Sequence, residues 1–436
     1  MSPVIAVFDI GKTNKKLLLF DEDYRIVYEK SQRLPEIQDE DGFPCEDVAA
    51  LTRWVLSSLS HAFKIKDFEI KVVNFSAHGA SFVNLDEYGK PVTPLYNYLK
   101  PFAEHLRAKF YETYGIESVP LSTASPILGN LNSAMQLYWL KHERPDAFRQ
   151  IKYALHLPAY ISHLITGKYY SDITSIGCHT QLWNFDKSEY HRWIHEEGIL
   201  EKLAPILPSN HVLAANFEDH KIIAGIGLHD SSAALIPYLK CFTDPFVLIS
   251  TGTWNISLNP FNENPLTAEE LNNGCLCYLS HEGNPVKASR LFAGHEHDEE
   301  VKRMAAHFNK SLEFIKSISY DAKYVSKKQD ENFAQIDFSK FSTIEEGYHG
   351  LMIAIVDRQI KSTELVIHNS AVKNIYVDGG FSSNPIFMNL LVHGFPKHKV
   401  YGATIPHASA LGAGLAIHPH WNDKNVSTNL VQLRSC

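Results

Sequence analysis

Apolar and polar residues alternate in blocks along this chain, and three short apolar blocks end in turns that contain glycine. They lie at 4–8, 246–249 and 375–377. Short runs of this kind, rich in β-branched and aromatic residues, favour buried strands over helices. After a polar turn, the first two continue into second apolar runs at 16–20 and 254–258. We therefore predict two strand–turn–strand units built on the same plan, one in each half of the chain.

Between the strands lie longer stretches whose apolar residues recur at helical spacing. We expect helices at 133–142, 158–166, 345–368, 384–392 and 408–417. Pro158 falls in the first turn of the second helix, where its missing N–H costs nothing, and Gly167 follows as a C-cap. Alternating strands and helices predict an α/β protein.

The length supports more than one domain, because 436 residues are too many for a single hydrophobic core. We place the boundary between Pro237 and Pro245, where two prolines and a polar stretch interrupt the pattern. The predicted domains are therefore 1–240 and 241–436. With 44% hydrophobic and 21% charged residues, the composition is that of a globular protein rather than a disordered or fibrous one.

Charge, hydropathy and cysteine usage limit the classes of partner and the cellular compartment that we expect. The net charge of −8 argues against a nucleic-acid partner and favours small molecules. No apolar run approaches the roughly 18 residues of a membrane span, and the N-terminus has no secretory pattern. Six scattered cysteines without a CxxC pair are typical of free thiols in a reducing compartment. We therefore expect a cytoplasmic protein with no membrane partner; whether it forms a homodimer stays open.

Two polar turns have the side chains needed to hold phosphate groups. In the first, Asp9 ends a strand and can hold a metal ion through water, while the amides after it, Thr13 and Asn14 can face phosphate oxygens. A lysine of the same turn can supply positive charge. The second turn, 250–253, repeats the hydroxyl groups and the glycine. Each turn alone is also explained by an ordinary hairpin. Two such turns, one in each half of the chain, could hold a triphosphate from both sides.

Two further turns carry candidate groups at strand ends. Asp230 follows a glycine-flanked strand and can orient a sugar hydroxyl group and accept its proton, or serve only as a helix N-cap. Gly379 and Gly380 lack Cβ atoms, so their backbone can approach a flat ligand closely, although a plain strand-to-helix turn also explains them. The segment 295–298 is not expected to bind a metal ion, because contiguous side chains diverge.

Taken in order, these segments resemble the FGGY family of carbohydrate kinases over nearly the whole chain. The similarity rests on 9–14, 76–79 with 85–91, 132–141, 164–172, 227–230, 251–253, 378–384 and 408–414. The resemblance implies an α/β fold of two domains, the actin-like ATPase (ribonuclease H-like) architecture with a central cleft. It also implies ATP-dependent phosphorylation of a sugar, with ATP and Mg²⁺ as cofactors.

The functional positions of the family can be carried over to this sequence. The resemblance implies Asp230 as the catalytic base and Asp9 as the residue that helps to hold Mg²⁺. It implies ATP contacts for Gly11, Lys12, Thr13, Asn14, Lys16, Gly252, Thr253, Gly379, Gly380 and Asn384. It implies sugar contacts for His78, Gly79, Asn97, His229 and Asp230. Two departures stand out: Lys12 replaces the usual threonine, and the sugar-binding acid that often follows an aromatic residue near Asn97 is missing.

Several segments look most like the rhamnulokinase branch of the family. They are 251–254, the alanine-rich run after Asp230, and 267–273 followed by 291–294. That resemblance implies a ketose or deoxyketose such as L-rhamnulose or L-fuculose, phosphorylated at a terminal hydroxyl group. Three alternatives stay open: a kinase for another substrate such as xylulose or a polyol, a nucleotide-dependent sugar sensor that has lost catalysis, and an actin-like ATPase that acts on a protein.

Overall fold

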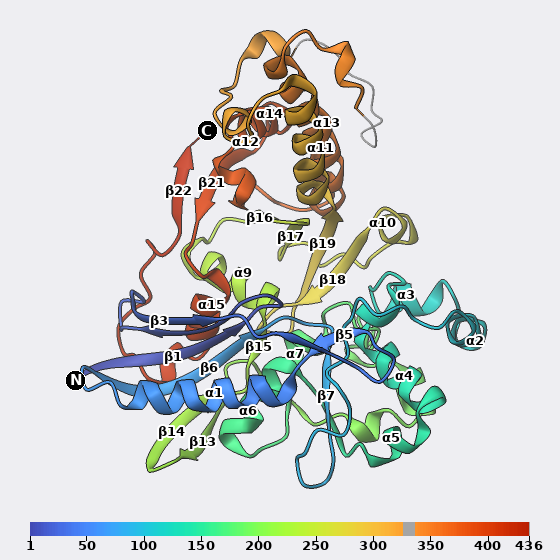
Figure 1. Cartoon of the computed structure of the whole chain (residues 1–436), viewed down its shortest axis with the longest axis vertical. Helices are drawn as coiled ribbons and strands as arrows, with labels where there is room; N and C mark the ends of the chain where they lie inside the picture. Colours follow the sequence, from blue (N-terminus) through green and yellow to red (C-terminus); the bar gives the residue numbers. More distant parts are fainter. Residues whose placement is uncertain (326–335, 436) are drawn as a thin grey trace.

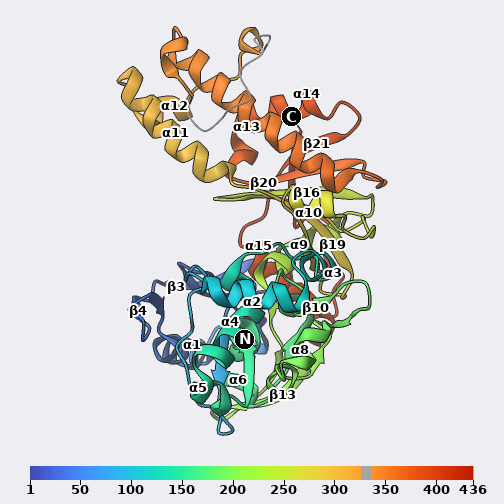
Figure 2. The same cartoon turned by 90° about the vertical axis from the view of Figure 1, so that its right-hand side faces the viewer.

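The computed structural model describes residues 1–325 and 336–435, and two β-sheets organise them (Figure 1, Figure 2). The first sheet has the order β13 (Val212–Phe217), β14 (His220–Gly225), β6 (Phe68–Ala77), β1 (Ser2–Ile10), β2 (Lys15–Phe20) and β3 (Ile26–Gln32), with β15 (Leu228–His229) also paired to β6. Strands β1, β14 and β15 run parallel to β6, whereas β2 folds back antiparallel to β1. The carboxyl ends of the parallel strands therefore meet at one edge of this sheet.

The second sheet repeats this plan. Its order is β18 (Cys275–Leu279), β19 (Pro285–Leu291), β17 (Asn255–Asn259), β16 (Phe246–Thr251), β20 (Asn374–Gly379), β21 (Lys399–Thr404) and β22 (Gln432–Ser435). Here β16 and β17 form the antiparallel hairpin, and β20 pairs parallel with β16 as β6 pairs with β1. The two strand–turn–strand units predicted from the sequence are confirmed.

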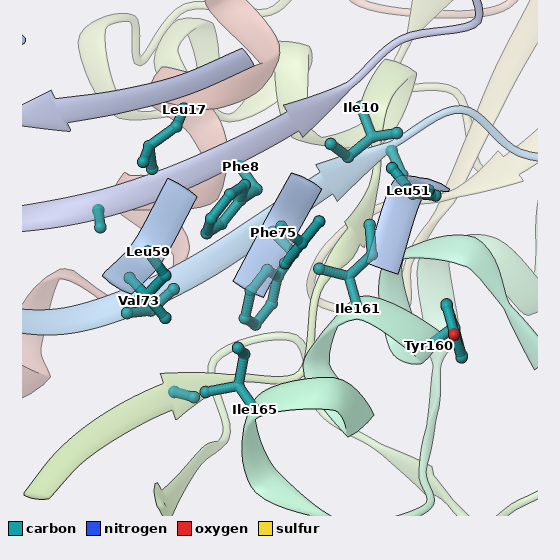
Figure 3. Close-up of a cluster of buried hydrophobic side chains, with 14 of the residues drawn as sticks. Phe8, Ile10, Leu17, Leu51, Leu59, Val73, Phe75, Tyr160, Ile161 and Ile165 are labelled. Carbon is teal, nitrogen blue, oxygen red and sulfur yellow. The ribbon is translucent and has the colours of Figure 1, made fainter. Parts of the chain in front are cut away.

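The side chains of β1 point alternately to the two faces of the first sheet, and helices cover both faces, so the strand is buried on each side. One set of alternate residues packs against α1 (Val48–Phe63) and α6 (Leu157–Thr166). In that cluster the rings of Phe8 and Phe75 stack with their centroids 6.1 Å apart, and Leu59 and Ile161 join them from the two helices (Figure 3). Each fully buried side chain of this size contributes about 1.5–3 kcal/mol. This core holds β1 and β6 in fixed register beneath the site that their ends form.

The other face of the first sheet is covered by α9 (Asp230–Cys241) and α15 (Ala408–Ala416), which pack on each other (Figure 1). A Cβ atom on Gly412 would lie 1.8 Å from the carbonyl oxygen of Ala233, so only glycine allows this approach. Pro237 stands inside α9 and has no N–H to donate to that carbonyl oxygen, which is therefore left facing Gly412. Pro237 does not end the helix, because α9 continues to Cys241. Helix α15 comes from near the end of the chain, yet it contacts β1 and β6 of the first sheet.

The helices expected from the sequence are all present. They are α4 (Ser133–Glu143), α6, α13 (Ile344–Ile367), α14 (Pro385–Gly394) and α15. Gly167 adopts the left-handed conformation after α6, as expected of a C-cap. The remaining α-helices are α2 (Glu104–Tyr114), α3 (Ser118–Ser122), α5 (Pro145–Gln150), α7 (Ile173–Ile176), α8 (Arg192–Glu196), α10 (Ala268–Asn272), α11 (Ala293–Phe308) and α12 (Leu312–Lys316).

Short strands complete the first half. They are β4 (Glu36–Gln38), β5 (Pro44–Glu46), β7 (Phe82–Leu85), β8 (Tyr153–His156), β9 (Ser171–Asp172), β10 (Trp183–Asn184), β11 (Glu189–Tyr190) and β12 (Ile206–Leu207). The cysteines at 45, 178, 241, 275 and 277 are free, and Cys436 lies outside the described residues. No helix within 1–325 and 336–435 is long and apolar enough to cross a membrane.

Candidate functional site

Three ionisable side chains leave the first sheet at the carboxyl ends of neighbouring strands. The register of β6 with β15 pairs Ala77 with His229. The next residues of these two strands, His78 and Asp230, therefore leave the sheet side by side. Because β1 runs parallel to β6 on the other side, Asp9 near the end of β1 lies at the same edge. In open sheets with parallel strands, this edge is where ligands usually bind.

Asp230 begins α9 rather than capping it. His229 is still extended and paired with β6, so it takes the N-cap position, and the N-cap interpretation of Asp230 is wrong. The Asp230 side chain is 33% exposed, and Oδ1 accepts a hydrogen bond from Ser231 Oγ at 3.3 Å. Burial raises the pKa of Asp230, whereas the nearby His78 lowers it. Asp230 lines a cavity of about 290 Å³ between the two sheets, together with Ser231, Ala234, Leu248, Ser250, Ile256, Leu258, Asp378, Ala408 and Ser409.

Asp9 lies close enough to Asp230 for the two carboxylates to affect each other. Burial, followed by the charge of Asp230, raises the pKa of Asp9 to about 6, although a hydrogen bond from Ser409 Oγ to Oδ1 at 3.0 Å opposes the rise. A divalent cation would relieve the repulsion between the two carboxylates, which supply the oxygen donors that Mg²⁺ prefers. No group of three or more His, Cys, Asp or Glu side chains suited to a metal ion exists among the residues described. The residues present therefore fit Mg²⁺ bound mostly through water and phosphate oxygens, which is its usual mode.

The turn after β1 is closed by a hydrogen bond from the amide of Gly11 to the carbonyl oxygen of Asn14 at 3.0 Å. Thr13 is exposed at its tip, and Asn14 Oδ1 accepts a hydrogen bond from Arg33 Nε at 3.1 Å. Lys16 points towards α15, with Nζ 3.1 Å from Nδ1 of His407 at the start of that helix. The turn therefore places a lysine beside the start of α15.

Lys12 points to the other side of the turn. Its Nζ atom lies 3.5 Å from carboxylate oxygens of both Glu36 and Glu46, and 5.6 Å from the ring centroid of Tyr98. Tyr98 in turn lies near Asp230, whose charge contributes to raising the Tyr98 pKa after the larger effect of burial. Lys12 thus lies among residues on the His78 side of the site, and Lys16 lies near α15.

A buried ion pair that the sequence analysis did not single out supports His78. Glu46 at the end of β5 is 8% exposed; its Oε2 lies 2.6 Å from Lys15 Nζ, and its Oε1 lies 2.7 Å from His78 Nε2. Lys15 Nζ also donates to the carbonyl oxygens of Gly11 at 2.9 Å and Lys12 at 3.1 Å. Burial alone would raise the pKa of Glu46, but the contacts with His78 and Lys15 hold it at about 2. The sequence gives one hint of this pair, since Lys15 and Glu46 stand inside otherwise strand-like segments.

Gly79 and His229 fit each other directly. A Cβ atom on Gly79 would lie 2.6 Å from the imidazole of His229, so glycine allows the ring to lie against the backbone. The ring is buried, burial lowers the pKa of His229 to about 3, and Nδ1 has no hydrogen-bond partner in the part of the chain that the structure describes. Asn97 is also buried; its Nδ2 donates to the carbonyl oxygen of Pro44 at 3.1 Å, and its Oδ1 accepts from the amide of Leu99 at 3.0 Å.

The turn after β16 is held to the turn after β20. Thr251 Oγ1 donates to the carbonyl oxygen of Asp378 at 2.5 Å and accepts from the amide of Phe381 at 3.0 Å. Gly379 has a φ of 84°, and a Cβ atom there would lie 1.9 Å from the carbonyl oxygen of Thr251. Both facts require glycine at this position. The two turns therefore form one rigid ledge at the edge of the second sheet.

Beside this ledge lies a cavity of about 480 Å³ that gathers four of the predicted ATP-binding residues. They are Gly252, Thr253, Gly380 and Asn384. Asn384 is the N-cap of α14, where Oδ1 accepts from two backbone amides, while Nδ2 donates to the hydroxyl group of Tyr348 at 2.7 Å. The volume is within the range of ordinary small-ligand pockets. Gly379, which belongs to the ledge, is not among the residues that line the cavity.

The histidine- and acid-rich segment at 295–298 lies in α11 and has structural partners. Glu296 pairs with Arg358 at 2.7 Å, and His297 Nε2 lies 3.2 Å from the hydroxyl group of Tyr348. The expectation that these contiguous side chains diverge agrees with this arrangement.

Comparison with known proteins gives a family match and several relatives. The model of the FGGY family of carbohydrate kinases, N-terminal domain, matches residues 4–236. A rhamnulokinase of Halalkalibacterium halodurans is 27% identical over 57% of this chain and 54% of that protein. A probable L-xylulose kinase of Haemophilus influenzae is 25% identical over 57% of this chain and 54% of that protein. The chain spans about half the length of the curated relatives it matches.

Solved structures resemble the chain over almost its whole length. A carbohydrate kinase from Novosphingobium aromaticivorans has a TM-score of 0.80 and 23% identity, with 100% of this chain and 94% of that chain covered. A ligand-bound xylulose kinase from Lactobacillus acidophilus has a TM-score of 0.81 and 16% identity, covering 99% of this chain and 93% of that one. At these identities the likeness shows the fold, and it confirms the two-domain, actin-like α/β architecture expected from the sequence.

Proposed function

The chain belongs to the FGGY family of carbohydrate kinases, and on that premise we propose that it transfers the γ-phosphoryl group of ATP to a hydroxyl group of a sugar. One observation carries the proposal: Asp9, His78 and Asp230 meet at the edge of the first sheet, and Asp230 lines a cavity shared with the second sheet. Phosphoryl transfer needs an oriented hydroxyl group, a carboxylate beside it and neutralisation of phosphate charge. Both sheets contribute groups of these kinds.

Asp230 is the proposed catalytic base. Its carboxylate accepts a hydrogen bond from the sugar hydroxyl group, aligns that oxygen with the γ-phosphorus, and takes the proton as the new P–O bond forms. His78 lies beside Asp230 and is held by Glu46 at 2.7 Å, so its ring has a fixed orientation from which to contact the sugar. Gly79, Asn97 and His229 are proposed to shape the same side of the sugar site.

ATP is proposed to lie across the second sheet. The adenosine contacts Gly380 and Asn384 in the cavity of about 480 Å³, and Gly379 holds that turn close to Thr251. The phosphates pass along Gly252 and Thr253 towards the first turn. There, the residues proposed to contact them are Gly11, Lys12, Thr13, Asn14 and Lys16.

Asp9 is proposed to hold Mg²⁺, which when bound would neutralise charge on the β- and γ-phosphates. Ser409 orients the Asp9 carboxylate by donating to Oδ1 at 3.0 Å, which leaves Oδ2 to face the metal ion or its water ligands. Ser409 lies in the first turn of α15, so the proposed metal site depends on the helix that returns from the second half of the chain.

For the substrate we propose a ketose or deoxyketose such as L-rhamnulose or L-fuculose. The sequence features of the rhamnulokinase branch support this choice, as do relatives named rhamnulokinase. A second candidate is xylulose or a polyol, favoured by the relative named as a probable L-xylulose kinase and by neighbours named xylulose kinase. A cytoplasmic location stays a prediction from the sequence, and whether the chain forms a homodimer stays open.

The test is an assay of ADP release with Mg-ATP across ketoses, deoxyketoses, pentitols and glycerol. Turnover with one sugar, together with a phosphorylated product detected by mass spectrometry, would support the kinase and identify its substrate. Sugar binding without turnover would favour the sensor instead. Neither binding nor turnover on any member of the panel would count against a sugar kinase.

A further inference from the structure

Arg290 lies near residues of both halves of the chain, and within 1–325 and 336–435 its cation has no acidic partner. It lies in β19, opposite Ile256 of β17, and is half-buried. Among the described residues its side chain forms no hydrogen bond or ion pair, and its Nε atom is buried without a partner. Burial lowers the pKa of Arg290 from its ordinary value, as expected of a guanidinium that has left water without meeting a carboxylate.

The side chain is nevertheless held in place. Its guanidinium carbon lies 5.6 Å from the ring centroid of Trp254, and the Trp254 ring packs against Phe292 with centroids 4.4 Å apart. Trp254 is 45% exposed, so part of its ring remains open to a ligand. It directly follows Thr253 of the proposed phosphate turn. The guanidinium and the exposed indole therefore form one surface beside the proposed ATP site.

This surface faces the sugar side of the first half. Arg290 is near enough to Tyr278 and Cys178 to interact with both electrostatically. Cys178 Sγ lies 3.6 Å from Nε2 of His229, the residue before Asp230, and the His229 and Tyr278 rings are 6.2 Å apart. Arg290 and Asp230 are thus separated by a small patch made of Cys178, Tyr278 and His229.

The patch between them carries no charge at neutral pH. Burial lowers the pKa of His229 to about 3 and raises the pKa values of Cys178 and Tyr278. None of these neutral groups can replace a carboxylate beside Arg290. A half-buried guanidinium that faces uncharged polar groups and an exposed indole has unused donors, and oxygen atoms of a ligand would satisfy them.

Building on the proposed sugar kinase, we propose that Arg290 and Trp254 form the second wall of the sugar site. The guanidinium donates hydrogen bonds to oxygen atoms at the end of the sugar remote from the hydroxyl group at Asp230, and the indole packs on a C–H face of the sugar. The oxygen pair is either two hydroxyl groups or a carboxylate. In this arrangement the second half of the chain helps to select the sugar, besides binding ATP.

The competing explanation is that Arg290 only packs on Trp254 and stiffens the hairpin. Replacing it would then change stability and leave the affinity for sugar unaltered. Arg303 on α11 is a control for the ring contact, because its guanidinium also lies over an aromatic ring, 5.3 Å from the centroid of Phe338, but it pairs with Glu300.

The experiment compares Arg290→Gln, Arg290→Lys, Trp254→Phe and the control Arg303→Gln with the wild-type chain. Steady-state kinetics give KM for the sugar and for ATP separately, and titration calorimetry gives sugar affinity without turnover. Losing hydrogen bonds from a charged donor is expected to raise the sugar KM and the sugar Kd of Arg290→Gln by about 10- to 100-fold. The ATP KM should stay within about twofold, Arg290→Lys should recover part of the loss, and Arg303→Gln should match wild type.

A matched pair of sugars, one neutral and one with a carboxylate at the remote end, separates the two oxygen sources. An Arg290→Gln defect confined to the acidic sugar identifies the carboxylate, and a defect on the neutral sugar identifies hydroxyl groups. An unchanged sugar KM and Kd in Arg290→Gln would overturn the inference even if the wild type is an active kinase. Sugar binding by the wild type without turnover would refute the kinase proposal, and the Kd values would still decide the role of Arg290.

Discussion

Replacing Glu46 by glutamine is expected to destabilise the protein in a way that depends on pH. The substitution keeps the shape of the side chain but removes its charge. It therefore leaves the Lys15 ammonium, only 3% exposed, without its carboxylate partner at 2.6 Å. The two carbonyl oxygens that Lys15 also contacts satisfy hydrogen bonds but do not balance the charge. Removing one partner of a buried pair is costly for this reason.

The size of the effect follows from the pKa of Glu46. Its value of about 2, compared with an ordinary 4.5, corresponds to roughly 3 kcal/mol of stability at neutral pH. Because the pKa is lower in the folded chain, the unfolded chain binds the proton first as the pH falls. The stabilisation is therefore complete above about pH 4.5 and is lost as the pH falls towards 2. At pH 3.5 about 1.4 kcal/mol of this stabilisation should already be lost.

Urea denaturation of wild type and Glu46→Gln at several pH values between 7 and 3.5 measures this difference. Glu36→Gln is the control, because Glu36 also lies 3.5 Å from a lysine but is 47% exposed, so its loss should cost less than about 0.5 kcal/mol. A cost for Glu46→Gln below about 1 kcal/mol at pH 7 would refute the reasoning. So would a cost that does not shrink between pH 5 and pH 3.5.

Three further substitutions test close contacts in the fold and the site. Gly412→Ala should destabilise the chain by about 2 kcal/mol or more, measured by thermal unfolding, because its Cβ would lie 1.8 Å from the carbonyl oxygen of Ala233; an unchanged melting temperature would contradict the α9–α15 packing. Gly79→Ala should displace the His229 imidazole, which a Cβ would approach to 2.6 Å, and weaken sugar affinity by calorimetry; unaltered affinity would show that the ring position is unimportant. Asn384→Ala should cost about 1 kcal/mol through loss of the α14 N-cap and should also raise the ATP KM; a stability loss with an unchanged ATP KM would separate the cap from the proposed adenosine contact.

Much of the fold could be predicted from the sequence, because local signals agreed with it. Glycine turns closed the strands, apolar periodicity marked the helices, and Gly167 ended α6 as a left-handed cap. The sequence did not show that α9 continues past Pro237, where the carbonyl oxygen left without a helical partner faces Gly412 of α15. A contact between residues so distant in the chain leaves no local pattern in the sequence.

Residues of the candidate site that end a strand could be predicted from the sequence. Residues whose contacts come from distant segments of the chain could not. Asp9 and Asp230 could be proposed because each follows an apolar run. Lys15 and Glu46 were missed, since each looks like an ordinary polar residue until β5 brings the carboxylate to the turn. Arg290 was missed for the opposite reason: it matters because it lacks a partner within the described residues, and a sequence does not show that.

The most direct test of the central claim is the turnover number of Asp230→Asn with the identified sugar, Mg-ATP and both substrates at saturation. The amide keeps the size of the side chain but cannot accept the proton. The account predicts a fall of about two to four orders of magnitude in kcat, with sugar affinity by calorimetry within a few-fold of wild type. A kcat within a few-fold of wild type would contradict the assignment of Asp230 as the base.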